Sequence, residues 1–476
     1  MNRAVIRIGF LPWTLVLVSS ALSQTKPDQS RTNAKTPGLA SQPALRAQID
    51  QYVAPFVRTN NFSGVILIAR GEKKLFEQGY GYANRELKVK NGPETRFHIA
   101  SVSKTFTAAA ILLLEQDARL SVRDRLTKWV PDYAQGDKIT IHHLLTHTSG
   151  IPNVNNFPDY DKNSLTHHSL EEIISWFKNK PLDFEPGAKY SYSNSNYNLL
   201  AYIVEKASGK SYGDFLEERI FSPLHLSHTG HDAGTAILLP DCADGYMPAR
   251  ADEVENAPSL DWSVKTGNGS IFSTAEDLYA WARALKTDKL LRADARTKLF
   301  ADHGDGVGYG WFVRSKAKHP SIAMNGRAPG FTANLEYFPE NDTYVVILSN
   351  LYSSITHAMA GDIGTIALGD QRKPAFMDVA ALPPSHAVLD LYAGEYLYDE
   401  TYRFSPNRSA NVERRGDWLV LITGGGTASY LLPQAEHTFL DRIYGGIVRF
   451  KLDSRGKVAG FDHDFGAFGS YPAVRR

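Results

Sequence analysis

The stretch "RFHIASVSKTFTAAAILLLEQ" (residues 96–116) places a serine and a lysine three positions apart at the head of an apolar helical pattern. In a helix, residues i and i+3 lie on the same side, about 5–6 Å apart, so Lys104 is expected beside the hydroxyl of Ser101. The free N–H groups at a helix N-terminus also favour a developing oxyanion. The pattern predicts a serine nucleophile with an adjacent base, but a Ser-x-x-Lys spacing is common in long chains.

The composition is that of an ordinary soluble globular protein. The chain has 476 residues, of which 43% are hydrophobic and 22% charged, and its formal net charge is +1. This length predicts two or three domains, and the near-neutral balance gives no reason to expect a nucleic-acid partner. The only cysteine, Cys242, cannot form an internal disulfide and is not expected to be catalytic.

The N-terminus has the pattern of an export signal. Two arginines precede an apolar stretch from Ile8 to Leu22, and small residues follow up to Ser23. We expect a secretory signal peptide over residues 1–23 and an exported protein, periplasmic or secreted. The alternative is a membrane anchor, but about 15 residues are short for a span, so the mature protein is expected to have none. The polar, proline-containing residues 24–43 predict a disordered linker.

Strand patterns lie on both sides of a helical middle. A hairpin pattern turns at residues 70–72, and four strand patterns lie between residues 308 and 350. In the middle, Ser169 and Glu172 have the spacing of a capping box. These patterns predict an α/β (α+β) domain over residues 44–368, in which both ends form one antiparallel sheet, flanked by helices and carrying a mostly helical insertion.

The C-terminal part has a different pattern. Residues 369–384 are rich in Gly, Asp, Arg, Lys and Pro, and predict a linker. Residues 385–476 contain many short strand patterns separated by Gly, Asn and Asp, which is typical of a small barrel or sandwich. Nothing in this segment forms a catalytic constellation.

A second stretch, "FEPGAKYSYSNSNYNLLAYIVEKASG" (residues 184–209), places a Tyr-x-Asn just ahead of a helix that Gly209 closes. A tyrosine near a cationic lysine loses its proton more easily, because the opposite charge favours phenolate. Tyr192 is therefore expected to act as a base or a proton relay with Lys104. Asn194 is expected to position both a substrate amide and the lysine.

Four segments in order resemble the serine β-lactamase and penicillin-binding-protein superfamily, in particular its class C-like branch, over roughly residues 45–365. They are "ITIHHLLTHTSGIP" (139–152), the Tyr-Ser-Asn stretch quoted above, "PLHLSHTG" (223–230) and "GNGSIFSTAEDLYAWARAL" (267–285). The resemblance implies that Ser101 is the acylated nucleophile, Lys104 its proton acceptor or stabiliser, Tyr192 the base or relay and Asn194 the positioning amide. The C-terminal segment resembles the small β-barrel domain appended to many exported members.

The third motif of this family departs from the usual pattern. Its Lys-Thr-Gly or His-x-Gly is here Met324-Asn325-Gly326. The resemblance implies that this strand borders the substrate and that the N–H of Arg327 is the second oxyanion donor beside that of Ser101. Because Met324 carries no charge, carboxylate recognition and efficient β-lactam hydrolysis are expected to be weakened. The side chain of Arg327 is a candidate to replace the lost charge.

No cofactor or metal is expected. Five histidines gather in two short runs, but no carboxylate or cysteine completes a spaced ligand set. The runs contain His142, His143, His147, His167 and His168. His147 is instead expected to form a hydrogen bond within its own loop.

The function expected from these residues is an exported serine hydrolase that cleaves an ester or amide through a Ser101 acyl-enzyme, with esters favoured. The partner is then a small-molecule or peptide substrate, with cell-wall-related peptides among the candidates. Alternatives are a D-Ala-type carboxypeptidase or D-aminopeptidase, a weak β-lactamase, and a non-catalytic scaffold or binding protein.

Overall fold

The structure is a computed structural model that describes residues 42–476, apart from residues 235–237, 251–252, 375–383, 403–406, 425–427 and 466–468. The predicted signal peptide and most residues of the two predicted linkers lie outside the described residues. Within the described part of the chain, no helix is both long enough and apolar enough to cross a membrane.

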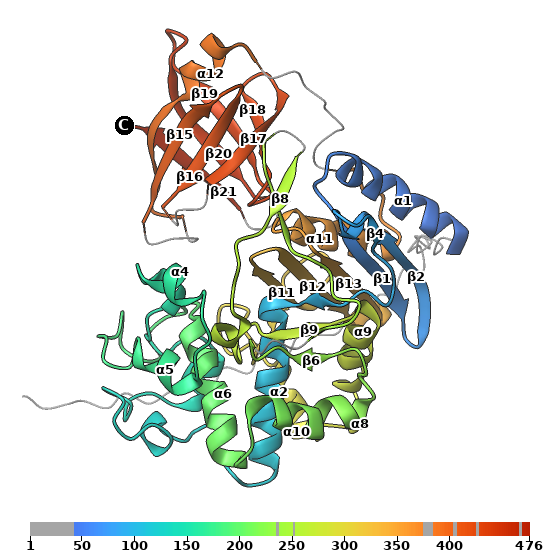
Figure 1. Cartoon of the computed structure of the whole chain (residues 1–476), viewed down its shortest axis with the longest axis vertical. Coiled ribbons are helices and arrows are strands. Elements are labelled where there is room, and N and C mark those ends of the chain that lie inside the picture. Colours follow the sequence, from blue (N-terminus) through green and yellow to red (C-terminus); the bar gives the residue numbers. More distant parts are fainter. Residues whose placement is uncertain are drawn as a thin grey trace, which may run out of the picture. The chain divides into compact units, whose positions relative to one another are not determined.

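A six-stranded antiparallel sheet forms the centre of the fold, in the order β10-β11-β12-β13-β1-β2 (Figure 1). Strands β1 and β13 pair along their whole length, from Gly64 opposite Ser349 to Arg70 opposite Thr343. This pairing confirms that both ends of the domain build one sheet. The strands are β1 (Gly64–Arg70), β2 (Lys73–Tyr80), β10 (Phe312–Arg314), β11 (Ser321–Ala328), β12 (Phe331–Phe338) and β13 (Thr343–Ser349).

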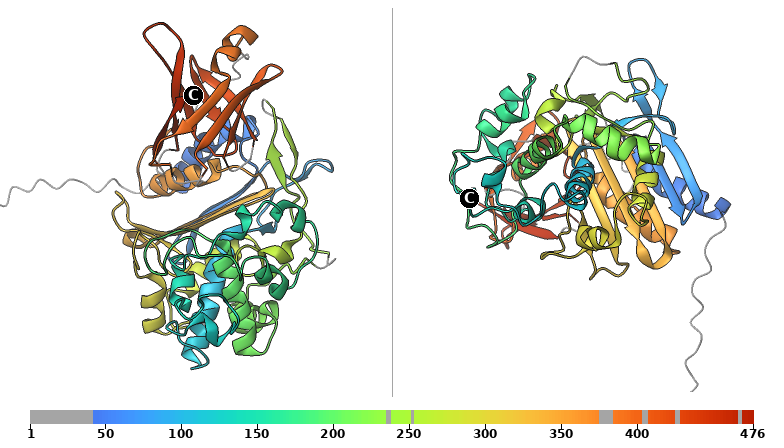
Figure 2. Two further views of the ribbon diagram at one scale, coloured as in Figure 1. Left: turned by 90° about the vertical axis from the view of Figure 1, so that its left-hand side faces the viewer. Right: turned by 90° about the horizontal axis from the view of Figure 1, so that it is seen from below.

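The central strands are buried on both faces, because helices cover each side of the sheet (Figure 2). Alternate residues along a strand point to opposite faces. Val65 and Leu67 therefore join the large core around helices α2 (Ser103–Gln116) and α9 (Ala275–Ala284), and Ile66 joins a second core. The second core contains helices α1 (Gln42–Arg58) and α11 (Ile355–Ala367).

The predicted helical insertion is present between β5 (Phe97–His98) and β9 (Ile271–Ser273). Its helix α5 (Leu170–Ser175) begins with the expected capping box of Ser169 and Glu172, and α6 (Asn194–Ser208) ends before Gly209, which has a φ of 74°. The remaining helices are α3 (Ile141–Leu145), α4 (Tyr160–Asn163), α5 (Leu170–Ser175), α6 (Asn194–Ser208), α7 (Tyr212–Leu216), α8 (Ser222–Leu224) and α10 (Ala293–Phe300). Short strands complete the domain: β3 (Tyr82–Asn84), β4 (Val89–Lys90), β5 (Phe97–His98), β6 (Gly230–His231), β7 (Tyr246–Pro248), β8 (Val254–Asn256) and β9 (Ile271–Ser273).

Short 3-10 turns connect several of these elements. They are η1 (Ala100–Val102), η2 (Leu126–Lys128), η3 (Val154–Asn156), η5 (Trp262–Lys265) and η6 (Pro339–Asn341), and a π-helical turn, η4 (Glu217–Phe221), links α7 to α8.

The C-terminal strands form a closed barrel, because β14 pairs with both β15 and β21. The prediction of a small barrel is therefore confirmed, and the sandwich alternative is wrong. Aromatic side chains dominate the interior, among them Tyr396, Phe450 and Phe461. The elements are α12 (His386–Tyr392), β14 (Gly394–Tyr398), β15 (Ser409–Arg415), β16 (Trp418–Thr423), β17 (Ala428–Ala435), β18 (Thr438–Asp441), β19 (Ile447–Leu452), β20 (Val458–Asp464) and β21 (Ser470–Arg475).

A buried arginine ties the loop after β18 to residues far away in the sequence. Arg442 is fully buried and donates hydrogen bonds to the side-chain Oδ1 of Asn61, at 2.8 Å, and to the carbonyl oxygens of Asn60, Ala249 and Glu253, at 3.0, 2.8 and 3.0 Å. The charge of the guanidinium is thus stabilised by several acceptors at once.

Candidate active site

Ser101 lies in the 3-10 turn η1, immediately before α2, rather than inside the helix itself. The residue before it, Ala100, has a φ of 46°. A non-glycine residue in this left-handed region is strained, and such strain persists where the surrounding structure holds it. Helix α2 anchors the turn, because its residues from Ser103 to Leu114 are all buried.

Lys104 reaches three oxygen atoms from the first turn of α2. Its Nζ lies 3.0 Å from Ser101 Oγ, 2.9 Å from Asn194 Oδ1 and 2.8 Å from the carbonyl oxygen of Asn268. The lysine is fully buried, so water does not compete for these contacts. Ser101, Lys104 and Asn194, which the sequence analysis singled out, are therefore brought together.

Asn194 is held in one orientation by residues that the sequence analysis did not identify. Its Nδ2 donates to Asn155 Oδ1 at 2.8 Å, so its Oδ1 is the atom that faces Lys104. Its backbone N–H donates to Asn153 Oδ1 at 3.1 Å. Asn153 and Asn155 lie just after the His-Thr-Ser-Gly segment, where polar residues in a short loop gave no distinct pattern.

Tyr192 completes the group from the segment that leads into α6. Its hydroxyl lies 2.7 Å from Ser101 Oγ, and its ring packs against His147 with a centroid distance of 4.5 Å. The Nδ1 of His147 accepts a hydrogen bond from the backbone N–H of Ser193 at 3.1 Å. The expectation that His147 bonds within its own loop is thus wrong for its side chain, which fixes the tyrosine segment instead.

Burial favours the neutral forms of both Lys104 and Tyr192, which the sequence pattern did not predict. Burial lowers the pKa of Lys104 well below its usual value, and the positive charge of Lys265 lowers it further. Burial also raises the pKa of Tyr192, an effect that the hydrogen bond to Ser101 only partly offsets. The expectation that a cationic Lys104 eases proton loss from Tyr192 is therefore wrong, because desolvation disfavours both charged forms.

The strand β11 runs directly past the serine turn. A Cβ atom placed on Gly326 would lie 2.7 Å from Ser101 N and 2.3 Å from the carbonyl oxygen of Ile99. Only glycine allows this approach. Strand β10 pairs with residues 321–323 alone, so among the described residues no sheet partner covers that edge of β11 from Met324 onward.

The hairpin register directs the backbone of Arg327 toward this free edge. Ala328 and Phe331 flank a two-residue turn, which makes them a hydrogen-bonded pair. Bonded and non-bonded pairs alternate along an antiparallel ladder, so the N–H of Arg327 points away from β12. It thus points to the side on which the Ser101 turn packs.

The side chains of Arg327 and Asn325 lie on the face of β11 opposite to that of Met324. The guanidinium of Arg327 lies between the rings of Tyr352 and Tyr444, at 4.7 and 4.9 Å from their centroids, and donates to Ser354 Oγ at 3.0 Å. Successive side chains of a strand alternate between faces. The alternative in which Arg327 replaces the lost charge in the site is therefore not supported.

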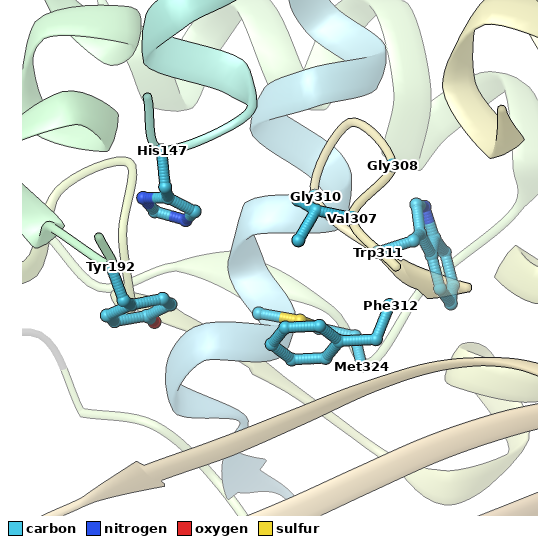
Figure 3. A pocket seen from close by; sticks show the side chains of 8 residues that line it. All are labelled: His147, Tyr192, Val307, Gly308, Gly310, Trp311, Phe312 and Met324. Carbon is cyan, nitrogen blue, oxygen red and sulfur yellow. The ribbon is translucent and has the colours of Figure 1, made fainter. Parts of the chain in front are cut away.

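Met324 faces the site and lines a small pocket beside Tyr192 (Figure 3). His147 and Tyr192 form one wall, and the loop from Val307 to Phe312 forms the other. The sequence pattern predicted a strand over residues 308–315, but only Phe312–Arg314 is extended. The preceding loop instead supplies apolar side chains to the pocket wall. Its lining residues are His147, Tyr192, Val307, Gly308, Gly310, Trp311, Phe312 and Met324.

Other reactive groups lie apart from this arrangement. Among the residues that the structure describes, no group of three His, Cys, Asp or Glu side chains is placed to hold a metal ion. His142 bonds instead to the hydroxyl of Tyr309 at 2.7 Å. Burial raises the pKa of the Cys242 thiol to about 12, which makes it a poor nucleophile.

Comparison with known proteins places the chain among penicillin-binding relatives. It is 28% identical over 429 residues to penicillin-binding protein 4* of Bacillus subtilis (strain 168), covering 83% of this chain and 91% of that protein. The crystal structure of a penicillin-binding protein from Bacillus halodurans matches with a TM-score of 0.59 at 28% identity, covering 66% of this chain and 99% of that one. The D-amino acid amidase of Ochrobactrum anthropi SV3 shares the fold, with a TM-score of 0.60 at 23% identity, covering 69% and 99%.

The family model described as "Beta-lactamase" matches residues 49–364, which span the sheet, the helical insertion and the whole group around Ser101. The expected family and fold are therefore both confirmed. The chain belongs to the Beta-lactamase family of serine hydrolases related to penicillin-binding proteins.

Proposed function

We propose that the protein hydrolyses an ester or amide through an acyl-enzyme on Ser101. The observation that carries this proposal is the hydrogen bonding of Lys104. Asn268 presents a carbonyl oxygen, and the Oδ1 of Asn194 is oriented toward the lysine, so both atoms can only accept. A neutral amine with two N–H groups satisfies both and keeps its lone pair for the hydroxyl proton of Ser101.

With Lys104 neutral, Tyr192 has a defined role in the reaction. A neutral phenol donates its O–H to Ser101 Oγ while the serine donates to Lys104 Nζ, which accounts for both contacts of the serine oxygen. On attack, the Ser101 Oγ–carbon bond forms and the serine proton passes to Lys104. The backbone N–H groups of Ser101 and Arg327 would then stabilise the oxyanion.

Collapse of the tetrahedral intermediate breaks the bond to the leaving group. Tyr192 is placed to donate its proton to the departing oxygen or nitrogen and to recover one from Lys104. Water then attacks the acyl carbon and loses a proton to the same pair. The Ser101 Oγ–acyl bond breaks, the pair returns a proton to Ser101 Oγ and the acid leaves, so the enzyme returns to its starting state. Each step uses only groups within hydrogen-bond reach of Ser101 Oγ, as acid–base catalysis requires.

Esters remain the favoured substrates. Met324 offers neither charge nor a strong donor on the strand that borders the site, and the pocket next to it is mostly apolar. A D-Ala-type carboxypeptidase or D-aminopeptidase is the second candidate, because a relative in fold is a D-amino acid amidase. Weak β-lactam hydrolysis and a non-catalytic binding role are the remaining alternatives, and cell-wall-related peptides are candidate partners.

Hydrolysis of p-nitrophenyl acetate and butyrate by the wild-type protein and Ser101→Ala tests the proposal. We expect turnover by the wild type and only the background rate for Ser101→Ala. Equal rates for the two proteins would favour the binding role. Release of D-alanine from a stem peptide, measured in parallel, separates the peptidase from the esterase.

Export is part of the same proposal. The pattern over residues 1–23 supports removal of a signal peptide near Ser23. N-terminal sequencing of the protein recovered outside the cytoplasm should begin shortly after residue 23, whereas an intact Met1 in that fraction would contradict cleavage.

A further inference from the structure

A loop of the C-terminal barrel contacts the strand that borders the active site. The loop spans residues 442–446, between β18 and β19. The ring of its Tyr444 has its centroid 4.9 Å from the guanidinium carbon of Arg327, and the carbonyl oxygen of its Ile443 accepts a hydrogen bond from that guanidinium at 3.3 Å. Tyr352, which follows β13, adds a second ring at 4.7 Å. Tyr352, Ile443 and Tyr444 thus form a clamp on Arg327, to which both domains contribute.

The barrel loop is held in one conformation by a buried carboxylate. Asp441, at the end of β18, is fully buried, and its Oδ1 accepts the backbone N–H groups of Ile443 and Tyr444 at 3.0 and 2.9 Å. The hydroxyl of Ser429 donates to the same oxygen. Such side-chain to backbone bonds fix a turn just after the aspartate. The place of the Tyr444 ring is therefore set by β18.

The same loop is joined to the residues at the start of α11. The carbonyl oxygen of Ile443 accepts the N–H of Ser354 at 2.8 Å, and Ser354 Oγ accepts from Arg327 at 3.0 Å. A Cβ atom on Gly445 would lie 2.7 Å from the backbone nitrogen of Ile355, the first residue of α11. The two backbones are thus in direct contact, so Tyr444 has a fixed place relative to the domain that carries Ser101.

Arg327 carries the proposed second oxyanion donor where β11 has little support. Strand β12 pairs with residues 322–328, whereas β10 pairs with residues 321–323 alone. Among the described residues, β11 therefore has one neighbouring strand at Arg327. The backbone N–H faces the Ser101 turn, and the side chain extends to the face of the sheet away from Met324. The clamp on that side chain supplies a second anchor for this part of the strand.

The clamp is expected to matter more for rate than for stability. A cation–π contact at a partly buried arginine stabilises a fold only slightly. A displacement of about 1 Å in an active site can lower a rate by about 10²-fold, and oxyanion donors act only when they are placed in advance. A small shift of the Arg327 N–H should thus lower kcat while the protein stays folded.

We propose that Tyr444 is a positioning residue for acyl transfer. Its ring fixes the side chain of Arg327 and, through it, the backbone N–H that stabilises the oxyanion. This inference rests on the proposed function and extends it, because it makes the barrel part of the catalytic unit. Tyr444 acts through Arg327 and not on the reacting atoms.

Variants on both sides of the clamp test the proposal with p-nitrophenyl butyrate. Tyr444→Ala removes the ring from the barrel, and Arg327→Met removes the guanidinium but keeps the backbone N–H. Each should lower kcat by about tenfold with little change in KM. Tyr444→Phe, which keeps the ring, should restore most of the rate. The control Tyr82→Ala removes a ring that is 37% exposed in β3 and should leave kcat unchanged.

The double variant shows whether the two residues act as one unit. Residues that act through a single contact have non-additive effects, so Tyr444→Ala combined with Arg327→Met should lose no more than the larger single loss. An unchanged kcat in both single variants, fully additive losses, or equal losses in Tyr444→Phe and Tyr444→Ala would overturn the proposal. A raised KM with unchanged kcat would overturn it as well.

Propylboronic acid tests the oxyanion donor without turnover. Ser101 Oγ adds to the boron, the serine proton passes to Lys104, and one boronate oxygen takes the position of the oxyanion, as in a transition-state analogue. Its inhibition constant should rise about tenfold in Tyr444→Ala and in Arg327→Met. That of butyramide, whose carbonyl carbon stays planar, should change little. An equal rise for both inhibitors, or no rise for propylboronic acid, would overturn the proposal.

Two further outcomes are kept apart by these measurements. Urea titration of every variant shows which of them fold, and Arg327→Met, which changes no barrel residue, tests the clamp where Tyr444→Ala does not fold. Failure of the proposed function has a different signature, because the wild type itself would then show no turnover that depends on Ser101. Failure of the clamp leaves that turnover in the wild type and leaves it unchanged in the variants.

Discussion

Gly326 approaches Ser101 so closely that a single added carbon atom would lie 2.7 Å from the serine amide nitrogen. The same carbon would lie 2.3 Å from the carbonyl oxygen of Ile99. Both of these are backbone atoms, which cannot rotate away as a flexible side chain does. This approach explains why the glycine of the third motif remains although its basic residue has become methionine.

Gly326→Ala is expected to separate the strand from the serine turn. Since this strand supplies one of the two proposed oxyanion donors, kcat should fall by roughly 10²-fold or more, the usual effect of losing one such donor. Steady-state kinetics on p-nitrophenyl butyrate provide the measurement. The matched control is Gly361→Ala in α11, where an added Cβ meets no atom within 4 Å; comparable losses in both variants would show that the close approach does not matter.

Asn155 is expected to act as a positioning residue through Asn194. Without the acceptor at 2.8 Å, the Asn194 amide can rotate and present its NH2 group to Lys104. Asn155→Ala should therefore lower kcat by about tenfold, which is the usual effect of losing one hydrogen bond to a reacting group. The KM should change little. The control Asn156→Ala alters an exposed neighbour in the same turn and should retain full activity. A raised KM with unchanged kcat in Asn155→Ala would contradict the positioning role and indicate that Asn155 contacts the substrate.

The pH dependence of kcat/KM should show that Lys104 and Tyr192 act in their neutral forms. Burial lowers the pKa of Lys104, so the amine becomes an acceptor as the pH rises through that lowered value, and the rate rises with it. Burial raises the pKa of Tyr192, so the rate should fall only above the usual range of tyrosine. Tyr192→Phe should remove the alkaline limb from the residual activity. A rate that declines between acidic and neutral pH would contradict this assignment.

Arg442 should contribute to stability rather than to chemistry. Its guanidinium is fully buried, and its removal would take a donor away from the Oδ1 of Asn61 and the carbonyl oxygen of Ala249, both in buried residues. Arg442→Met should lower the free energy of unfolding by about 3 kcal/mol, seen as a lower midpoint in urea titration. Arg455→Met, in an exposed turn, should leave the midpoint unchanged.

The fold could be predicted largely from periodicity and motif order. The short apolar runs of β1 and β13 and the capping box at Ser169 are local patterns, and the structure contains the elements that they predict. The catalytic group was predictable for a different reason, because Ser101, Lys104, Tyr192 and Asn194 carry the family resemblance.

The environment of those residues could not be predicted in the same way. The protonation of Lys104 and Tyr192 depends on burial, which a sequence pattern does not measure. The carbonyl of Asn268 acts through the backbone, so its side-chain type gives no signal.

Mapping of the covalent adduct decides whether Ser101 is the nucleophile. The wild-type protein, treated with a fluorophosphonate or a fluorescent penicillin and digested with trypsin, should carry the adduct on the peptide Phe97–Lys104, and fragmentation should place it on Ser101 rather than Ser103. Ser101→Ala should carry none. An unmodified wild-type peptide, or equal labelling of Ser101→Ala, would contradict a Ser101 nucleophile.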